Sequence, residues 1–167
     1  MGQYYIAVFL DNNNNIKGCI RSWTYDCGSK LREHAYHKNP FVTAVELELS
    51  PGGRFHKSRV VWAGDYADNE PGSPYNLHAK CENMDDVPVS LIPQPSLRFL
   101  VNHSKKLVVD MQLTPGRYHP LPLLTAEGNG RGGGDVEAMP FIGAWARDVL
   151  SLESDPPKDF GTFAVCF

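Results

Sequence analysis

The sequence of 167 residues contains no hydrophobic run near the roughly 18 residues that a membrane span needs. It has no basic stretch ahead of its apolar N-terminal segment, so it does not begin like a secretory signal peptide. Charge of one sign is also missing, because 16 Lys and Arg stand against 19 Asp and Glu and give a formal net charge of −3. We therefore expect a cytoplasmic protein with no membrane partner and no extended nucleic-acid surface.

Cysteine is scarce, and its spacing is not that of a metal site. The four cysteines form no CxxC pair, and the six histidines stand singly in the sequence. Structural zinc sites usually show paired ligands, so the sequence predicts no metal centre. Four cysteines in a chain of this size favour reduced, partly buried thiols over a disulfide framework. These residues are Cys19, Cys27, Cys81 and Cys166.

The composition that remains is that of a globular domain with many turns. Hydrophobic residues make up 42% of the chain and charged residues 21%, while 15 glycines and 13 prolines exceed their average share. We expect residues 1–167 to form one domain. Residues 4–10 are apolar, stop at an Asp-Asn-Asn-Asn-Asn turn and return through residues 16–23, which predicts a hairpin. Further strands are predicted at 59–64, at 97–102 paired with 106–113, at 120–126 and at 161–167.

Three other segments complete the expected fold. Asn39-Pro40 is an N-cap followed by proline, and Phe41, Val42 and Val45 share a helical face, which favours a helix ending before residues 51–53. The alternation of residues 45–49 also fits a strand. Residues 142–152 fit a strand or a short helix, and residues 69–95 form the longest irregular segment. The expected class is α+β, a mostly antiparallel or mixed sheet of about seven strands with one or two packed helices.

A glycine-rich loop at residues 128–135 is the most unusual segment. Five glycines in seven positions indicate unusual φ values or a close approach of the backbone. Successive backbone N–H groups can bind an anion, and an arginine adds a planar fork for phosphate. The motif matches no nucleotide-binding template, and a wide hairpin without a ligand remains the alternative. The candidate ligand-binding residues here are Asn129, Arg131, Gly132, Gly133, Gly134 and Asp135.

Other candidate residues lie at the ends of predicted strands. Carboxylates in such places can hold a divalent metal or act as a general base, although Asp is also a common turn residue. Aromatic rings can stack on a base or sugar, although they are more often core residues. A possible acid–base group is formed by Glu33, His34 and His37. The alternative is that these residues lie on a half-exposed face of a helix. The acidic and aromatic candidates are Asp65, Asp68, Asp135, Asp148, Trp62, Tyr66 and Trp145.

Four separated segments carry a resemblance to a known family. They are residues 1–5 (MGQYY), 60–68 (VVWAGDYAD), 130–135 (GRGGGD) and 142–148 (IGAWARD). The chain resembles a family of small bacterial and phage proteins of uncharacterised function that begin MGQYY or MGQYW and carry an RGGGD loop and a WxGDYA run. Many similar sequences have glycine where this chain has Arg147. The resemblance implies an accessory or counter-defence role but no activity.

Three functions remain open on the sequence alone. The first is a ligand-binding domain in which the glycine-rich loop holds a phosphorylated small molecule or nucleotide. The second is a metal-assisted hydrolase or phosphoesterase that uses Asp65, Asp135 and Asp148. The third is a phage or accessory protein that binds and inhibits a host protein, for which an exposed apolar patch is the expected sign. The sequence indicates no cofactor and does not decide whether the protein is an enzyme.

Overall fold

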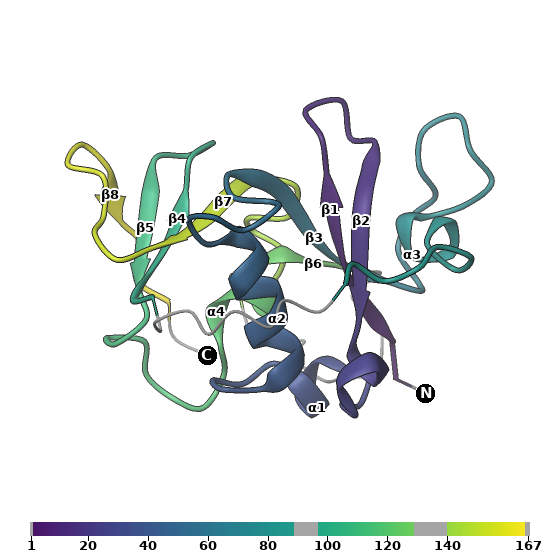
Figure 1. The fold of residues 1–167 in the computed structure, drawn as a ribbon, viewed down its shortest axis with the longest axis horizontal. Helices are drawn as coiled ribbons and strands as arrows, with labels where there is room; N and C mark the ends of the chain where they lie inside the picture. Colours follow the sequence, from purple (N-terminus) through teal and green to yellow (C-terminus); the bar gives the residue numbers. More distant parts are fainter. Residues whose placement is uncertain (1, 89–96, 129–139, 166–167) are drawn as a thin grey trace.

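The computed structural model describes residues 2–88, 97–128 and 140–165. Within these ranges the chain forms one sheet of eight strands with four α-helices, which confirms the predicted α+β class (Figure 1). The strand order is β2-β1-β3-β7-β4-β5-β8, and β6 pairs with β3 beside β7. None of the helices in the described ranges has the length and apolar character needed to cross a membrane.

The sheet joins strands from both halves of the chain. Most neighbours are antiparallel, and the β3–β6 and β5–β8 pairs are parallel. Both predicted hairpins are present, β1–β2 and β4–β5. The strands are β1 (Tyr5–Leu10), β2 (Ile16–Arg21), β3 (Ser58–Gly64), β4 (Phe99–Asn102), β5 (Leu107–Asp110), β6 (Ala126–Glu127), β7 (Val149–Glu153) and β8 (Gly161–Thr162).

The helices are short, and only one exceeds two turns. α2 crosses the middle of the sheet, while α3 lies at its β2 end (Figure 1). The helical elements are η1, a 3-10 helix (Ser22–Tyr25), α1 (Leu31–His34), α2 (Pro40–Leu49), α3 (Leu77–Lys80) and α4 (Pro120–Thr125). The prediction of a helix after Asn39 is confirmed, because the Asn39 side chain accepts hydrogen bonds from the N–H groups of Phe41 and Val42.

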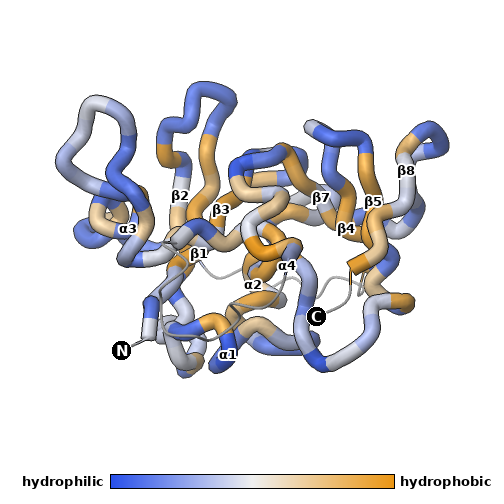
Figure 2. The backbone as a smooth tube through the Cα atoms, turned by 180° about the vertical axis from the view of Figure 1, so that it is seen from behind, coloured by the Kyte–Doolittle hydropathy of each residue, from blue (hydrophilic) through white to orange (hydrophobic). Residues whose placement is uncertain are grey.

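Both faces of β1 are buried, and they contribute to different clusters of the core. Ala7 and Phe9 pack with α2 and α4 in the larger cluster, whereas Ile6 and Val8 pack with α3 in a smaller one. Strand alternation explains this division, because successive side chains point to opposite faces. Hydrophobic segments run through the strands, α2 and α4, and hydrophilic segments lie at the hairpin tips (Figure 2). The sheet therefore has two covered faces of unequal size.

The prediction of a strand at residues 120–126 is wrong, because this segment is α4 followed by the two-residue strand β6. Two prolines in the segment suggested an edge strand. They instead occupy the first turn of a helix, where backbone N–H groups need no partner within the helix. His119 caps that turn, since its Nδ1 accepts the N–H of Leu121 at 3.0 Å.

Other boundaries differ from the sequence-based expectation. Residues 142–152 form a turn and then β7. Of the predicted strand at 161–167, residues 161–165 are described, and among these Gly161–Thr162 form β8. The irregular segment 69–95 contains the one-turn helix α3. Residues 62–65 and 145–148 share the sequence pattern Trp-Ala-x-Asp but adopt different structures, because Trp62 lies on β3 and Trp145 lies in the turn before β7.

A buried hydrogen-bonded chain links three parts of the fold. Trp62 on β3 donates its indole N–H to Nε2 of His34 at 2.9 Å, and Nδ1 of His34 donates to the Gly28 carbonyl at 2.9 Å. His34 is fully buried, and its ring meets Phe41 edge-on with centroids 4.9 Å apart. Because the indole is only a donor, Nε2 must stay unprotonated. His34 is therefore a neutral core residue and not an exposed acid–base group.

We predict that acid destabilises the fold through His34. Burial lowers its pKa from 6.5 to about 4, so the unfolded chain takes up the proton first as the pH falls. The contribution of His34 is complete above pH 6.5 and is lost between pH 6.5 and about 4, by roughly 3 kcal/mol. Urea unfolding at several pH values should show this slope, and NMR titration of the His34 ring should give the low pKa.

His34→Gln provides the control, because an amide can keep both hydrogen bonds but does not titrate in this range. The variant should show a weaker loss of stability between pH 6.5 and 4. The other shifted histidines, His37, His78 and His103, also have lowered pKa values and remain in both proteins. Equal slopes in the two proteins, or a His34 ring that titrates near pH 6.5, would contradict the assignment.

Candidate functional site

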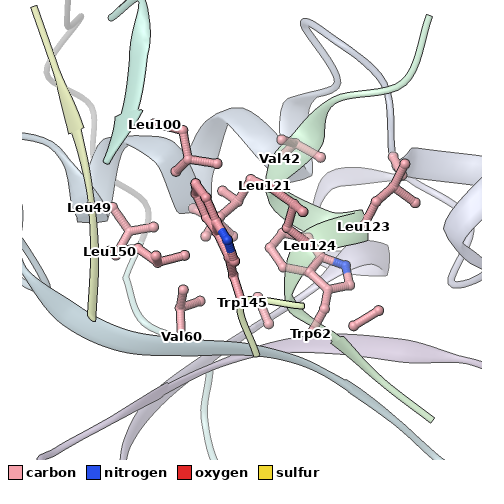
Figure 3. Packing of buried hydrophobic residues seen from close by; sticks show 14 of the residues in the cluster. Val42, Leu49, Val60, Trp62, Leu100, Leu121, Leu123, Leu124, Trp145 and Leu150 are labelled. Carbon is pink, nitrogen blue, oxygen red and sulfur yellow. The ribbon is translucent and has the colours of Figure 1, made fainter. Parts of the chain in front are cut away.

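Trp62 and Trp145 lie in the core and not at a surface site. Their exposed fractions are 0% and 1%, and Leu121, Leu124 and Leu150 pack around them (Figure 3). The backbone N–H of Trp145 donates to the backbone carbonyl of Leu124 at 2.7 Å, which fixes the turn against α4. For these two rings the core alternative holds, since neither has a free face for a ligand.

Asp65 and Asp148 lie at opposite ends of β3. Asp65 follows the last residue of the strand, whereas the Asp148 carbonyl accepts the N–H of Val60 near its start. The strand rises about 3.3 Å per residue between Val60 and Asp65, so the two aspartates are separated by roughly 16 Å of strand. The Asp148 carboxylate pairs with Lys105 and accepts from Asn102 at 2.7 Å. The two carboxylates do not share a site, and the described part of the chain holds no group of three or more potential metal ligands.

The candidates of the glycine-rich loop, residues 129–135, lie outside the described residues, so the anion-binding loop stays a prediction. The segment before it is well packed. A Cβ on Gly128 would lie 2.0 Å from Oε1 of Gln3, and one on Gly64 would lie 2.6 Å from the Glu127 carbonyl. Two of the resembling segments, residues 1–5 and 60–68, therefore meet around the buried Gln3 side chain, next to Gly128.

His37 borders a cavity of about 540 Å³ beside α2, where several polar groups are already paired. Nε2 of His119 lies 3.2 Å from the Glu46 carboxylate, and its Nδ1 caps α4. Arg98 is bound by both oxygens of Asp110. Among the residues that the structure describes, no buried polar atom of this cavity lacks a partner. A ligand would gain little there.

A second cavity, of about 460 Å³, lies on the α3 face of the sheet. Its volume is within the range of small-molecule sites. Among the described members of the predicted site, Asp65 is the one that lines it. We call this cavity the aromatic pocket, and its lining residues are Ile6, Arg21, Trp23, Asp65, Asn69, Pro74, Tyr75, Asn76, His78, Ala79 and Glu82.

Exposed aromatic rings surround the aromatic pocket. Trp23 and Tyr75 line it and are 54% and 59% exposed. Tyr4 and Tyr66 are also exposed. The backbone N–H of Tyr4 donates to the Asp65 carboxylate, and Tyr66 follows Asp65 in the sequence. Large aromatic side chains gain most from burial, so rings left in water at one end of a sheet are typical of a binding surface.

Sequence analysis missed Trp23 and Tyr75 for different reasons. Trp23 falls in the expected second strand, where an aromatic residue suggests burial, but the chain leaves the sheet at η1 and turns the ring outward. Tyr75 lies between Pro74 and Asn76 in the irregular segment. The only available signal was an aromatic residue among turn-forming residues, which does not indicate which other segment it faces.

Arg21 lies on the floor of the pocket with its charge compensated. Nη1 pairs with Asp86 at 2.5 Å, and Nη2 donates to the Cys81 carbonyl. The guanidinium carbon is 5.8 Å from the centroid of the Trp23 ring, which is a cation–π distance. Arg21 thus fixes the indole and ties β2 to the segment after α3.

His78 presents a buried nitrogen without a partner. Its Nε2 has no hydrogen-bond partner among the described residues. Burial lowers the pKa of this histidine, and Arg21 also lowers it, while Asp65 and Glu82 oppose the shift. The ring is therefore neutral at pH 7. Because this nitrogen is itself buried, a ligand in the pocket does not reach it without movement of the surrounding side chains.

Arg147 holds the loop that carries Tyr75. Its guanidinium bonds both oxygens of Glu127, at 2.6 and 2.8 Å, and both oxygens of Glu70. The Glu70 N–H in turn donates to the Tyr75 carbonyl at 2.9 Å. The pKa of Glu70 is lowered by this pairing. Arg147 has φ of +66°, a conformation that favours glycine, the residue that the resemblance implies at this position.

We predict that Arg147→Lys loosens the loop of residues 69–76. Lysine keeps the charge and the backbone conformation but cannot bind two carboxylates through a planar fork. We expect a loss of about 1–2 kcal/mol of stability and faster amide exchange at Glu70. Arg98→Lys is the matched control, because Arg98 also binds a carboxylate through two bonds but lies on the distant β4–β5 hairpin. Equal exchange at Glu70 in both variants would contradict the role of Arg147.

No protein-family model, curated protein or solved structure matches this chain. The assignment of a function therefore depends on the geometry of the described residues, and in the aromatic pocket exposed aromatic rings and carboxylates line one cavity.

Proposed function

We propose that the protein is a small-molecule-binding domain and that its ligand occupies the aromatic pocket with a flat ring against Trp23 and Tyr75. The observation that carries the proposal is a cavity lined by polar side chains with two exposed rings, Trp23 and Tyr75, at its edge. Among the described residues, no exposed Trp or Tyr ring lines the cavity beside α2.

The energetics favour a ligand that has both a ring and a polar edge. Stacking of a nucleic-acid base on an aromatic side chain is worth about 1–3 kcal/mol, which indicates what each ring can contribute. Asn76 cannot contribute, because its amide already bonds Asp65, Ala67 and Ala79. Polar groups on the ligand would instead meet the side chains of Asp65, Asn69 and Glu82, which also line the pocket.

The nucleotide hypothesis has two parts, the binding of the base and the binding of the phosphate. A nucleobase is a suitable ring for Trp23 and Tyr75. The phosphate was assigned to Arg131 and its neighbours, outside the described residues, and the aromatic pocket itself offers no free cation among its lining residues, since Arg21 is paired with Asp86. We therefore propose the ring-binding part for this pocket and retain the phosphate site as a prediction for residues 129–135.

Docking on a host protein is a second candidate function. It is favoured by the same exposed rings, Tyr4, Trp23, Tyr66 and Tyr75, because aromatic residues are enriched at protein interfaces. Such an interface would cover the rings without needing a group inserted into the cavity. The hydrolase hypothesis gains no such support, because Asp65 and Asp148 lie far apart, at opposite ends of β3.

Trp23 gives a direct measurement of binding, because it is the exposed one of the three tryptophans. We predict that a ligand among ribonucleosides, their 5′-monophosphates and small aromatic amines changes its fluorescence and raises the melting temperature. Tyr75→Ala should weaken that binding about tenfold or more, which corresponds to roughly 1.4 kcal/mol.

Leu113→Ala is the control for Tyr75→Ala, since Leu113 is also exposed, at 75%, but does not line the aromatic pocket. Binding that Tyr75→Ala leaves unchanged would place the ligand elsewhere. If none of these compounds binds, while a host protein is captured by the wild type and lost with Tyr75→Ala, the docking function replaces small-molecule binding.

A further inference from the structure

The charges of the aromatic pocket do not cancel. Arg21 and Asp86 form one compensated pair, with side chains only 11% and 15% exposed. Asp65 and Glu82 remain, and within the described ranges no lysine, arginine or histidine forms a salt bridge with either. The pocket therefore carries an excess of about two negative charges at neutral pH.

Both carboxylates act on the interior of the pocket. They interact electrostatically with His78, and each opposes the lowering of its pKa by burial. One oxygen of Asp65 accepts the Tyr4 N–H at 3.0 Å, which fixes the carboxylate at the end of β3. Glu82 follows Cys81, whose carbonyl is held by Arg21. The negative charges are thus placed by the sheet and by the segment after α3.

The aromatic rings add to the same potential. The face of an indole or phenol ring is electron-rich and attracts cations, and the attraction is stronger where water is excluded. Trp23 already has the Arg21 guanidinium against it, 5.8 Å from the ring centroid. Tyr75 has no cation–π partner among the described residues and is 59% exposed. A cation can therefore bind between the Tyr75 ring and the two carboxylates.

An anion would bind unfavourably in this pocket. A phosphate or carboxylate in the pocket would be repelled by Asp65 and Glu82 and would find the guanidinium of Arg21 occupied by Asp86. A neutral ligand would gain no Coulomb attraction from either carboxylate. Of the three charge types, a cation is the one that the lining charges favour.

We infer that the aromatic pocket selects an organic cation, a small molecule in which an ammonium group is joined to a flat ring through a short carbon chain. The inference rests on the proposed function, since it names the class of ligand for the same pocket. The ring packs on Trp23 or Tyr75, and the ammonium group binds between Asp65 and Glu82. The cavity of about 460 Å³ has room for both parts.

Three probes with the same ring but different charge test the inference. They are 2-phenylethylamine, which is a cation at pH 7, 2-phenylethanol, which is neutral, and phenylacetate, which is an anion. We expect the amine to bind at least about tenfold more tightly than the alcohol and phenylacetate to bind most weakly, by Trp23 fluorescence and calorimetry. Added salt should weaken the binding of the amine and leave the binding of the alcohol unchanged.

Neutral isosteres test the role of the carboxylates. Asp65→Asn/Glu82→Gln should abolish the preference for the amine over the alcohol while keeping the side-chain volumes. Asp155→Asn/Asp159→Asn changes the net charge equally at two exposed residues near β8 and should keep the preference. If the first double variant does not fold, Glu82→Gln alone, whose carboxylate forms no salt bridge among the described residues, should reduce the preference about threefold or more.

The outcomes separate this inference from the proposed function. If the alcohol or phenylacetate binds as tightly as the amine, and Tyr75→Ala weakens it, the cation preference is wrong and small-molecule binding stands. If the amine preference persists in the isosteric variants, the carboxylates do not cause it. If a lysine-containing peptide binds more than about tenfold tighter than the amine, the cation belongs to a protein and the small-molecule source is overturned. Absence of binding by all three probes overturns the inference, and the nucleoside titrations then decide the proposed function.

Discussion

The hydrogen bond from Trp62 to His34 is the constraint on which the arrangement of this protein depends. It holds the central strand β3 against α1, and through Gly28 and Phe41 it fixes the segment before α1 and the start of α2. Because the bond is buried and directional, losing either partner would leave a buried polar group unpaired. On its way from β2 to α1 the chain leaves the sheet at η1, where Trp23 is exposed.

The aromatic pocket is a consequence of how unevenly the sheet is covered. The face with α2 and α4 carries the larger cluster of the core, whereas the other face is covered by the one-turn helix α3 and its flanking segments. A short helix cannot fill the space beside β1, so a cavity remains next to Ile6. Polar contacts instead of apolar packing fix its walls, with Asn76 at the cap of α3 and Arg147 on the loop of residues 69–76.

Electrostatics in this molecule are organised by paired arginines. Arg147 and Arg21 both bind carboxylates in partly buried positions, and each connects segments about 60 or more residues apart in sequence. These pairs hold the segments around the pocket while leaving Asp65 and Glu82 without a counter-ion among the described residues. The same interactions that build the pocket therefore also set its charge.

Local sequence signals were sufficient for elements with strong local determinants. The Asp-Asn turn specified the β1–β2 hairpin, and Asn39-Pro40 specified the start of α2, because turn and cap preferences act over a few residues. At residues 120–126 the prolines were read as strand breakers, since whether a proline begins a helix depends on a capping residue and on the face it buries. Asp65 was identified as a site residue, but its partners were not.

The sequence by itself determined the α+β class, the two hairpins, the capped helix and the free thiols of Cys19, Cys27 and Cys81. Tertiary structure decided that Trp62 and Trp145 are core residues, that Asp65 and Asp148 lie apart, and that Trp23, Tyr75 and His78 surround one cavity. The physical reason is the separation in sequence over which each interaction acts. Caps and turns depend on neighbouring residues, whereas a pocket depends on side chains that only the sheet register and long-range ion pairs bring together.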